Sequence, residues 1–392
     1  MFSGLTERLH DDIQAIKDVA AFTDRVRARF ADIDDVPESI ADLLTAAPNR
    51  LVWQIYDHCA ALTRLYAVYE TFVEELATEY LRLLPALYEQ YEKLPDPILR
   101  QHRIGIAQIL LKVGDAGPYR ELQERDVVAH LADGLAGDRP YALLPNAFFI
   151  DRQNYRLDAL VRLFGCLGVG ELSGRLHRHP VLQRFLREQR GESTTLDAEL
   201  SAFVQRRNEA AHSHVDEIIG LDEFHSLAEF VRLLSYALAE LLSLEVISHR
   251  VTLGQATACG VVEETHYDGF VVVARMEAVS LAKGDELLIL HNAEFVAPAA
   301  IESLQVNDLD CDHLNASEGQ KVGIRLSARC ISGNILARFA APTQSTPPQL
   351  GLFIAEEFPD SEPLETALED SEQLSDLPDG NIIEDVSPAG DQ

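Results

Sequence analysis

The sequence is poor in cysteine, and its cysteines do not stand in pairs. The 392-residue chain has five of them, and no C-x-x-C occurs. An odd number without paired spacing argues against a disulfide framework or a zinc site, and it fits a reducing cytosol. Long apolar runs are also absent, and the first ten residues carry charge without an apolar signal core. We therefore expect a cytoplasmic protein with no membrane span, no metal site and no cofactor.

Basic residues are scarce as well. The chain has 33 Lys and Arg against 64 Asp and Glu, which gives a formal charge of −31. Residues 351–392 hold 13 acidic residues and no Lys or Arg, which leaves −18 for the first 350 residues. Phosphate contacts need Lys and Arg, so a protein this acidic is not expected to coat nucleic acid non-specifically. A site for RNA would need a local basic face.

Helical periodicity dominates the first 250 residues. Two long helices are expected near residues 5–30 and 51–84, because apolar residues recur there at steps of three or four and form one stripe on each helix. The first stripe includes Val19 and Phe22, and the second includes Tyr66. Pro85 should kink or end the second helix. A third helix should begin with Asp96 as its N-cap and Pro97 at its first helical position. Further helices are expected at residues 119–135, 154–168, 180–190, 196–212 and 221–249. The pattern predicts a helical domain over residues 1–250.

The pattern changes near residue 250 to short β-type runs. GFVVVARM, DELLILHN, KVGIRLS and NILARFA are separated by turns rich in Gly and Asp. This spacing predicts a small all-β barrel or sandwich over residues 251–345. Residues 346–392 are low in aromatics and rich in Pro, Ser and acidic residues, which predicts a disordered acidic tail. We expect a multidomain α and β protein in this order.

One predicted helix carries the candidate chemistry. It begins near Thr195 and contains the string R-R-N-E-A-A-H-S at residues 206–213. Asn208 and His212 are four residues apart and share a face, while Arg207 borders the apolar face. A guanidinium, an amide and an imidazole therefore project from adjacent turns. The plain alternative is a solvated Arg and a His that favours the helix dipole at a C-terminus.

The string R-N-x-x-A-H resembles the motif of the HEPN superfamily (higher eukaryotes and prokaryotes nucleotide-binding). Residues 154–168, NYRLDALVRLFGCLG, are similar to the segment before the motif helix in bacterial members. Residues 65–73, LYAVYETFV, look like their first core helix. The resemblance covers residues 45–250. One departure is Ser213, where many members have Gly after the motif histidine.

The resemblance implies a helical bundle that forms a homodimer, with two motifs facing one cleft. It also implies a metal-independent endoribonuclease. Such proteins often serve as toxins or anti-phage defence effectors. His212 would transfer protons, Arg207 would bind the phosphate, and Asn208 would hold the phosphate or orient His212. The chemistry is sound, because imidazole titrates near neutrality and Arg grips phosphate oxygens in a fork. His212 and His214 as a metal-ligand pair would lack two further ligands.

The most basic stretch precedes the motif helix. Residues 175–190 contain five Arg and one Glu. Arg175, Arg178, Arg184 and Arg187 are the candidate contacts to an RNA backbone. The alternative is a solvated helix face that pairs with the acidic surface elsewhere.

The β region resembles the second domain of translation GTPases such as elongation factor Tu. K-G-D-E-L at residues 283–287, I-E-S-L-Q at 301–305 and V-G-I at 322–324 carry this resemblance. No G-x-x-x-x-G-K-[ST] occurs, so nucleotide hydrolysis is not inferred. The barrel would bind tRNA, the ribosome or a protein partner, or serve as a structural appendage. Beside the RNase, two functions stay open: a non-catalytic HEPN-type binding or signalling protein, and a ribosome- or tRNA-associated factor led by the barrel.

Overall fold

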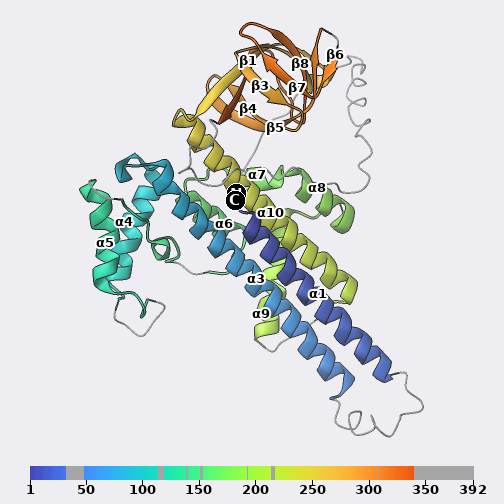
Figure 1. Cartoon of the computed structure of the whole chain (residues 1–392). Helices are drawn as coiled ribbons and strands as arrows, with labels where there is room; N and C mark the ends of the chain where they lie inside the picture. Colours follow the sequence, from blue (N-terminus) through green and yellow to red (C-terminus); the bar gives the residue numbers. More distant parts are fainter. Residues whose placement is uncertain are drawn as a thin grey trace, which may run out of the picture. The chain divides into compact units, whose positions relative to one another are not determined.

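The computed structural model describes residues 1–31, 48–113, 119–137, 140–150, 153–191, 193–212, 217–307 and 309–339. The regular elements up to residue 252 are helices, and strands follow from residue 256 (Figure 1). The predicted order of a helical part before a β part is therefore confirmed. The predicted acidic tail, residues 346–392, lies outside the described residues.

Three long helices, α1 (Ser3–Ala31), α3 (Arg50–Leu87) and α10 (Leu221–Thr252), contact one another pairwise. The shorter helices are α4 (Asp96–Leu110), α5 (Glu124–Ala136), α6 (Leu157–Cys166), α7 (Leu172–His177), α8 (Pro180–Phe185) and α9 (Leu196–Ala211). A π-helical turn, Leu186–Arg190, continues α8. Short 3-10 turns lie at Tyr91–Lys93 and Pro145–Phe148. Among the described residues, no helix has both the length and the apolar character needed to cross a membrane.

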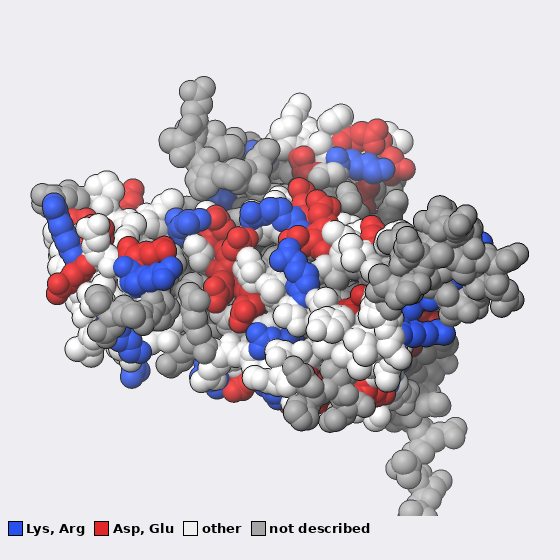
Figure 2. Space-filling model, turned by 90° about the horizontal axis from the view of Figure 1, so that it is seen from below, with Lys and Arg blue, Asp and Glu red and all other residues white. Residues whose placement is uncertain are grey.

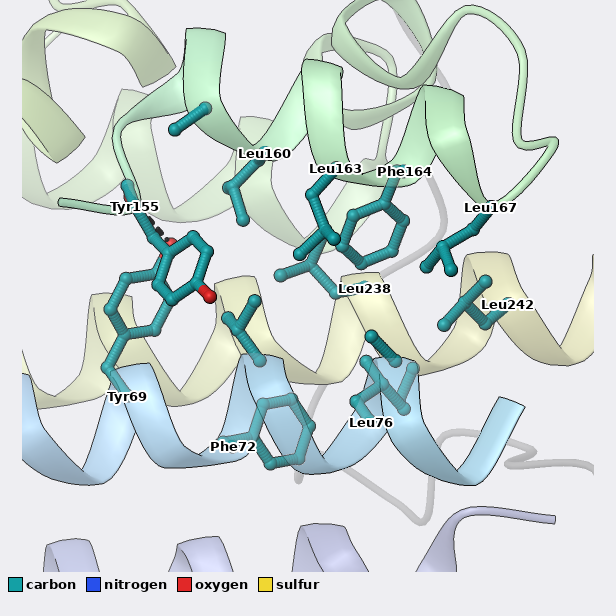
Figure 3. Close-up of a cluster of buried hydrophobic side chains, with 14 of the residues drawn as sticks. Tyr69, Phe72, Leu76, Tyr155, Leu160, Leu163, Phe164, Leu167, Leu238 and Leu242 are labelled. Atoms are coloured by element: carbon teal, nitrogen blue, oxygen red, sulfur yellow. Dashed lines mark hydrogen bonds between the residues drawn. The ribbon is translucent and has the colours of Figure 1, made fainter. Parts of the chain in front are cut away.

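The core of the helical part lies where α3, α6 and α10 meet (Figure 3). Figure 3 shows Tyr69, Phe72 and Leu76 from α3, Leu160, Leu163 and Phe164 from α6, Leu167 at the end of α6, and Leu238 and Leu242 from α10. Burial of such apolar surface is worth roughly 25 cal/mol per Å². The packing anchors α6 on α3, and it thereby fixes the chain segment just before α6.

Two helix boundaries differ from the prediction. Helix α3 continues past Pro85 to Leu87, and the N–H of Tyr88 still donates to the carbonyl of Leu84 at 2.8 Å. A proline near the last turn removes one donor without stopping the turns around it. Helix α4 is capped by Pro95 with no side-chain bond, so the predicted N-cap, Asp96, is instead its first residue.

The apolar stripe predicted on α1 holds only for its first half. Leu9 and Ile13 are buried, whereas Val19 and Phe22 are 62% and 65% exposed. Each step of three residues falls about 60° short of a full helical turn. Phe22 comes three such steps after Ile13, so it lies on the opposite side of the helix. The inward face instead continues through Arg27, which bonds Asp24 and Asp57 at 2.6 Å each.

Nine strands form the β part: β1 (Ala256–His266), β2 (Val271–Met276), β3 (Val279–Ala282), β4 (Glu286–His291), β5 (Glu294–Val306), β6 (Leu309–Cys311), β7 (His313–Ala316), β8 (Lys321–Leu326) and β9 (Ile335–Phe339) within the described residues. The larger sheet has the order β4-β9-β1-β2-β8-β5-β6, all antiparallel, and β4 also pairs with β5. This last pairing closes a six-stranded barrel, which decides between the predicted barrel and sandwich. Strands β3 and β7 form a separate pair.

Candidate functional site

Helix α9 positions the motif residues. The Thr195 side chain caps its N-terminus by accepting from the N–H of Ala198 at 3.2 Å, and the helix begins where the sequence predicted, next to Thr195. Leu200, Phe203 and Val204 are fully buried and hold α9 on the core. The helix ends at Ala211, so Arg207 and Asn208 lie in its last turns and His212 is its C-cap.

Arg207 lies on an aromatic ring of α3. Its Cζ is 4.3 Å from the centroid of the Tyr66 ring, which is a favourable cation–π distance. Its Nη1 donates to Oδ1 of Asn154 at 3.2 Å and to Oδ1 of Asn208 at 3.1 Å. The Nε atom is buried and has no hydrogen-bond partner among the described residues. Arg207 also pairs with no described carboxylate, whereas its neighbour Arg206 pairs with Glu223 at 2.6 Å.

The side chain of Asn208 binds the Arg207 guanidinium. Its Oδ1 accepts from Arg207 and also from Nδ2 of Asn154 at 3.4 Å. Its backbone carbonyl accepts from the N–H of His212 at 3.0 Å. The sequence predicted that Asn208 holds the phosphate or orients His212. If Asn208 orients His212, it does so through the backbone of α9. The geometry adds a role that the sequence did not suggest, which is to hold the guanidinium.

Two tyrosines of α3 fix the segment that carries Asn154. The backbone N–H of Tyr155 donates to the Tyr66 hydroxyl at 3.0 Å. The Tyr69 hydroxyl donates to the carbonyl of Tyr155 at 3.0 Å (Figure 3). The Tyr155 hydroxyl donates to Oε1 of Glu74 at 3.2 Å. Burial is the main cause that raises the pKa of Tyr66 to about 12, so this phenol stays neutral near pH 7.

His212 is exposed at the end of α9. A second imidazole, that of His58, lies close enough to Arg206 and Glu209 of α9 for their charges to act on it. His58 of α3 is buried, and burial followed by the charge of Arg206 lowers its pKa, while Glu209 raises it. His58 lines a small pocket together with residues of α1, α3 and α10 that contains neither Arg207 nor His212. Ser213 and His214 lie outside the described residues.

The basic stretch runs along α10 and away from the motif. Arg206 pairs with Glu223, and Arg190 donates to Oγ of Ser226 at 2.9 Å. Arg175 pairs at 3.3 Å with Glu245, which comes 22 residues after Glu223. A helix rises about 1.5 Å per residue, so these two contacts are about 33 Å apart along α10. The stretch therefore approaches the motif at its Arg190 end.

The candidate arginines of this stretch differ in exposure. Arg178 and Arg187 are exposed, and Arg184 is half-buried. Arg178 lies 3.9 Å from a carboxylate oxygen of Glu171, and both side chains are well exposed. Figure 2 shows a face on which Lys and Arg lie interspersed with Asp and Glu, and the described residues on it form no continuous basic tract. On this face, the described residues therefore offer no broad phosphate-binding surface.

Comparison with known families shows the family of the helical part. A family model described as HEPN_MAE_28990-like HEPN matches residues 45–250. No curated protein and no solved structure matches the chain. The matched span includes Tyr66, Asn154, Arg207, Asn208 and His212. The barrel lies outside it, so the resemblance of the barrel to translation GTPases stays a prediction.

Proposed function

We propose, from the premise that this chain belongs to the HEPN family, that it is an endoribonuclease in which Arg207 and His212 cleave RNA without a metal ion. One observation carries the proposal. The Arg207 guanidinium lies over the Tyr66 ring, with Cζ 4.3 Å from the ring centroid, pairs with no described carboxylate, and keeps a buried Nε without a partner among the described residues. A cation that the fold orients without neutralising is suited to bind a phosphate.

The proposed reaction uses the nucleophile that RNA carries. His212 takes the proton of a ribose 2′-hydroxyl, whose oxygen then attacks the adjacent phosphorus. The bond from phosphorus to the 5′-oxygen breaks, and a second imidazole donates a proton to that oxygen. Arg207 stabilises the negative charge on the pentacoordinate phosphorus. The products are a 2′,3′-cyclic phosphate and a 5′-hydroxyl.

This scheme needs two imidazoles at one phosphate, and a homodimer supplies them. HEPN domains often dimerise, and we propose that the partner subunit's His212 completes the site. His212 is exposed at the end of α9, where a second copy can approach it. His58 is placed less well as the acid, since it is buried and its lowered pKa favours the neutral ring.

We propose that bound RNA leaves the motif along α8 and α7. Arg184 and Arg187 stand at the near end of the basic stretch, and Arg178 stands further along. Arg175 contributes less, because its guanidinium is engaged by Glu245. The net charge of −31 opposes RNA binding, so these few phosphate contacts act against a repulsive field.

A second candidate is a non-catalytic HEPN-type binding or signalling protein. The exposure of His212 at the end of α9 favours this candidate. A partner of the barrel (tRNA, the ribosome or a protein), a role as a toxin or defence effector, and a cytoplasmic location stay predictions from the sequence.

The test of function uses the purified full chain on total RNA with EDTA present. Wild type is expected to cleave, while His212→Ala and Arg207→Ala are expected to lose about 10²-fold or more of the rate. Arg82→Ala and His266→Ala are matched controls, because both side chains are exposed and lie outside the motif helix. No cleavage of diverse RNAs by the wild type would favour the binding protein.

A further inference from the structure

Asn154 reaches Arg207 from a distant part of the chain. It precedes α6 and lies 53 residues before Arg207, yet its amide bonds both Arg207 and Asn208. The three side chains form a closed set: Nη1 of Arg207 donates to both amide oxygens, and the amide nitrogen of Asn154 donates to the oxygen of Asn208. Arg207 is therefore held by two elements, α9 and the segment before α6.

The segment that carries Asn154 is itself fixed. The N–H of the next residue, Tyr155, donates to the Tyr66 hydroxyl. The carbonyl of Tyr155 accepts from the Tyr69 hydroxyl (Figure 3). Tyr155 is buried, and so are the two tyrosines of α3. Tyr66 also supplies the ring under the guanidinium. Tyr66 thus supports the Arg207 guanidinium with its ring and fixes, through its hydroxyl, the segment that carries the Asn154 amide.

The amides of Asn154 and Asn208 bind one side of the Arg207 guanidinium and leave another edge without these contacts. Nη1 has two N–H groups, and the two amide oxygens take both of them. The edge formed by Nε and Nη2 can offer two parallel N–H groups to two oxygens of a phosphate. Nε, on that edge, has no hydrogen-bond partner among the described residues. Buried donors without a partner are rare in native proteins, which fits an edge reserved for a ligand.

We propose that Asn154 is a positioning residue, which turns the Nε–Nη2 edge of Arg207 toward the scissile phosphate. This inference rests on the proposed function. Asn154 touches no reacting atom and acts through Arg207. Without the Asn154 amide, Nη1 of Arg207 loses one acceptor, and the guanidinium is free to turn on the Tyr66 ring.

A double-mutant cycle on RNA cleavage tests the proposal. Asn154→Ala is expected to lower kcat/KM about 10-fold to 100-fold, as small misplacements of a catalytic group do. Because Asn154 acts through Arg207, the double variant with Arg207→Ala should be no slower than Arg207→Ala alone. A structural defect would instead add to the loss. Gln153→Ala, which removes the exposed neighbouring amide, is the matched control and should cleave as wild type does.

A second readout needs no RNA. Phenylglyoxal modifies accessible guanidinium groups, and peptide mass spectrometry gives the rate at Arg207. Asn154→Ala should raise that rate several-fold, while Asn154→Asp, which keeps an acceptor oxygen, should leave it near wild type. Equal rates in all three proteins, or additive losses in the cycle, would overturn the role of Asn154. If wild type cleaves no RNA, the proposed function fails. The modification rates still decide whether Asn154 holds the Arg207 guanidinium in place.

Discussion

A buried histidine far from the motif makes the stability of the helical part depend on pH. His102 of α4 is fully buried. Its Nε2 accepts from the N–H of Leu144 at 3.1 Å, so this nitrogen carries no proton. Its Nδ1 lies 2.9 Å from the Tyr91 hydroxyl and carries the proton of the neutral ring. Protonation would cost the Leu144 bond and place a charge in the core.

The size of the effect follows from the pKa. Burial, then the charges of His130 and Arg103, lowers the pKa of His102 from 6.5 to about 4. Between these values the unfolded chain binds more protons than the folded one, so stability rises with pH. The stabilisation that depends on neutral His102 is fully present above pH 6.5 and is lost as the pH falls toward 4. From pH 7 to pH 5 the loss is about 2 kcal/mol.

Urea unfolding followed by tryptophan fluorescence measures this loss. The single tryptophan, Trp53, lies on α3 and reports on the helical part. The drop in unfolding free energy from pH 7 to pH 5 should be about 2 kcal/mol smaller in His102→Gln than in wild type. His177→Gln removes an exposed imidazole and should match the wild-type drop. Equal drops in wild type and His102→Gln would refute the reasoning.

Two further predictions concern packing and RNA binding. Gly105→Ala should unfold the helical part or sharply lower its melting temperature, because the new Cβ would lie 2.0 Å from the carbonyl oxygen of Ala147. Gly165→Ala meets nothing within 4 Å and should stabilise α6 by up to about 1 kcal/mol, and equal melting temperatures for the two variants would contradict this account. Arg187→Ala should reduce the salt slope of RNA binding by about 1. Arg175→Ala should change that slope less, and the reverse order would remove the proposed RNA path.

The fold could be predicted where periodicity and local chemistry agree. The long helices, the start of the motif helix near Thr195 and the four β-type runs all appear in the structure. Strand β1 was missed, because ATACGVVEETH begins with small residues and does not alternate cleanly. Strand β5 was missed in turn, since EFVAPAAIESLQV contains Pro298. Helix α7 was missed because its six residues are too few to show a period.

The site could be predicted only in part. The motif string singled out Arg207, Asn208 and His212 because they share one helix, where spacing in the sequence is spacing in space. Asn154 gave no such signal, since its contact with Arg207 depends on how the segment before α6 is tied to α3. Tyr66 was assigned to an apolar stripe, and it is indeed buried, but its hydroxyl and ring face also serve the site.

The central claim is that His212 and Arg207 cleave RNA through its own 2′-hydroxyl. The most direct measurement compares one RNA oligonucleotide with the same sequence that carries a single 2′-deoxy nucleotide at the mapped cleavage position, with EDTA present. We predict that wild type cuts the first to a 2′,3′-cyclic phosphate end and spares the second, and that His212→Ala cuts neither. Cleavage of the deoxy position, or cleavage by His212→Ala at the wild-type rate, would contradict the account.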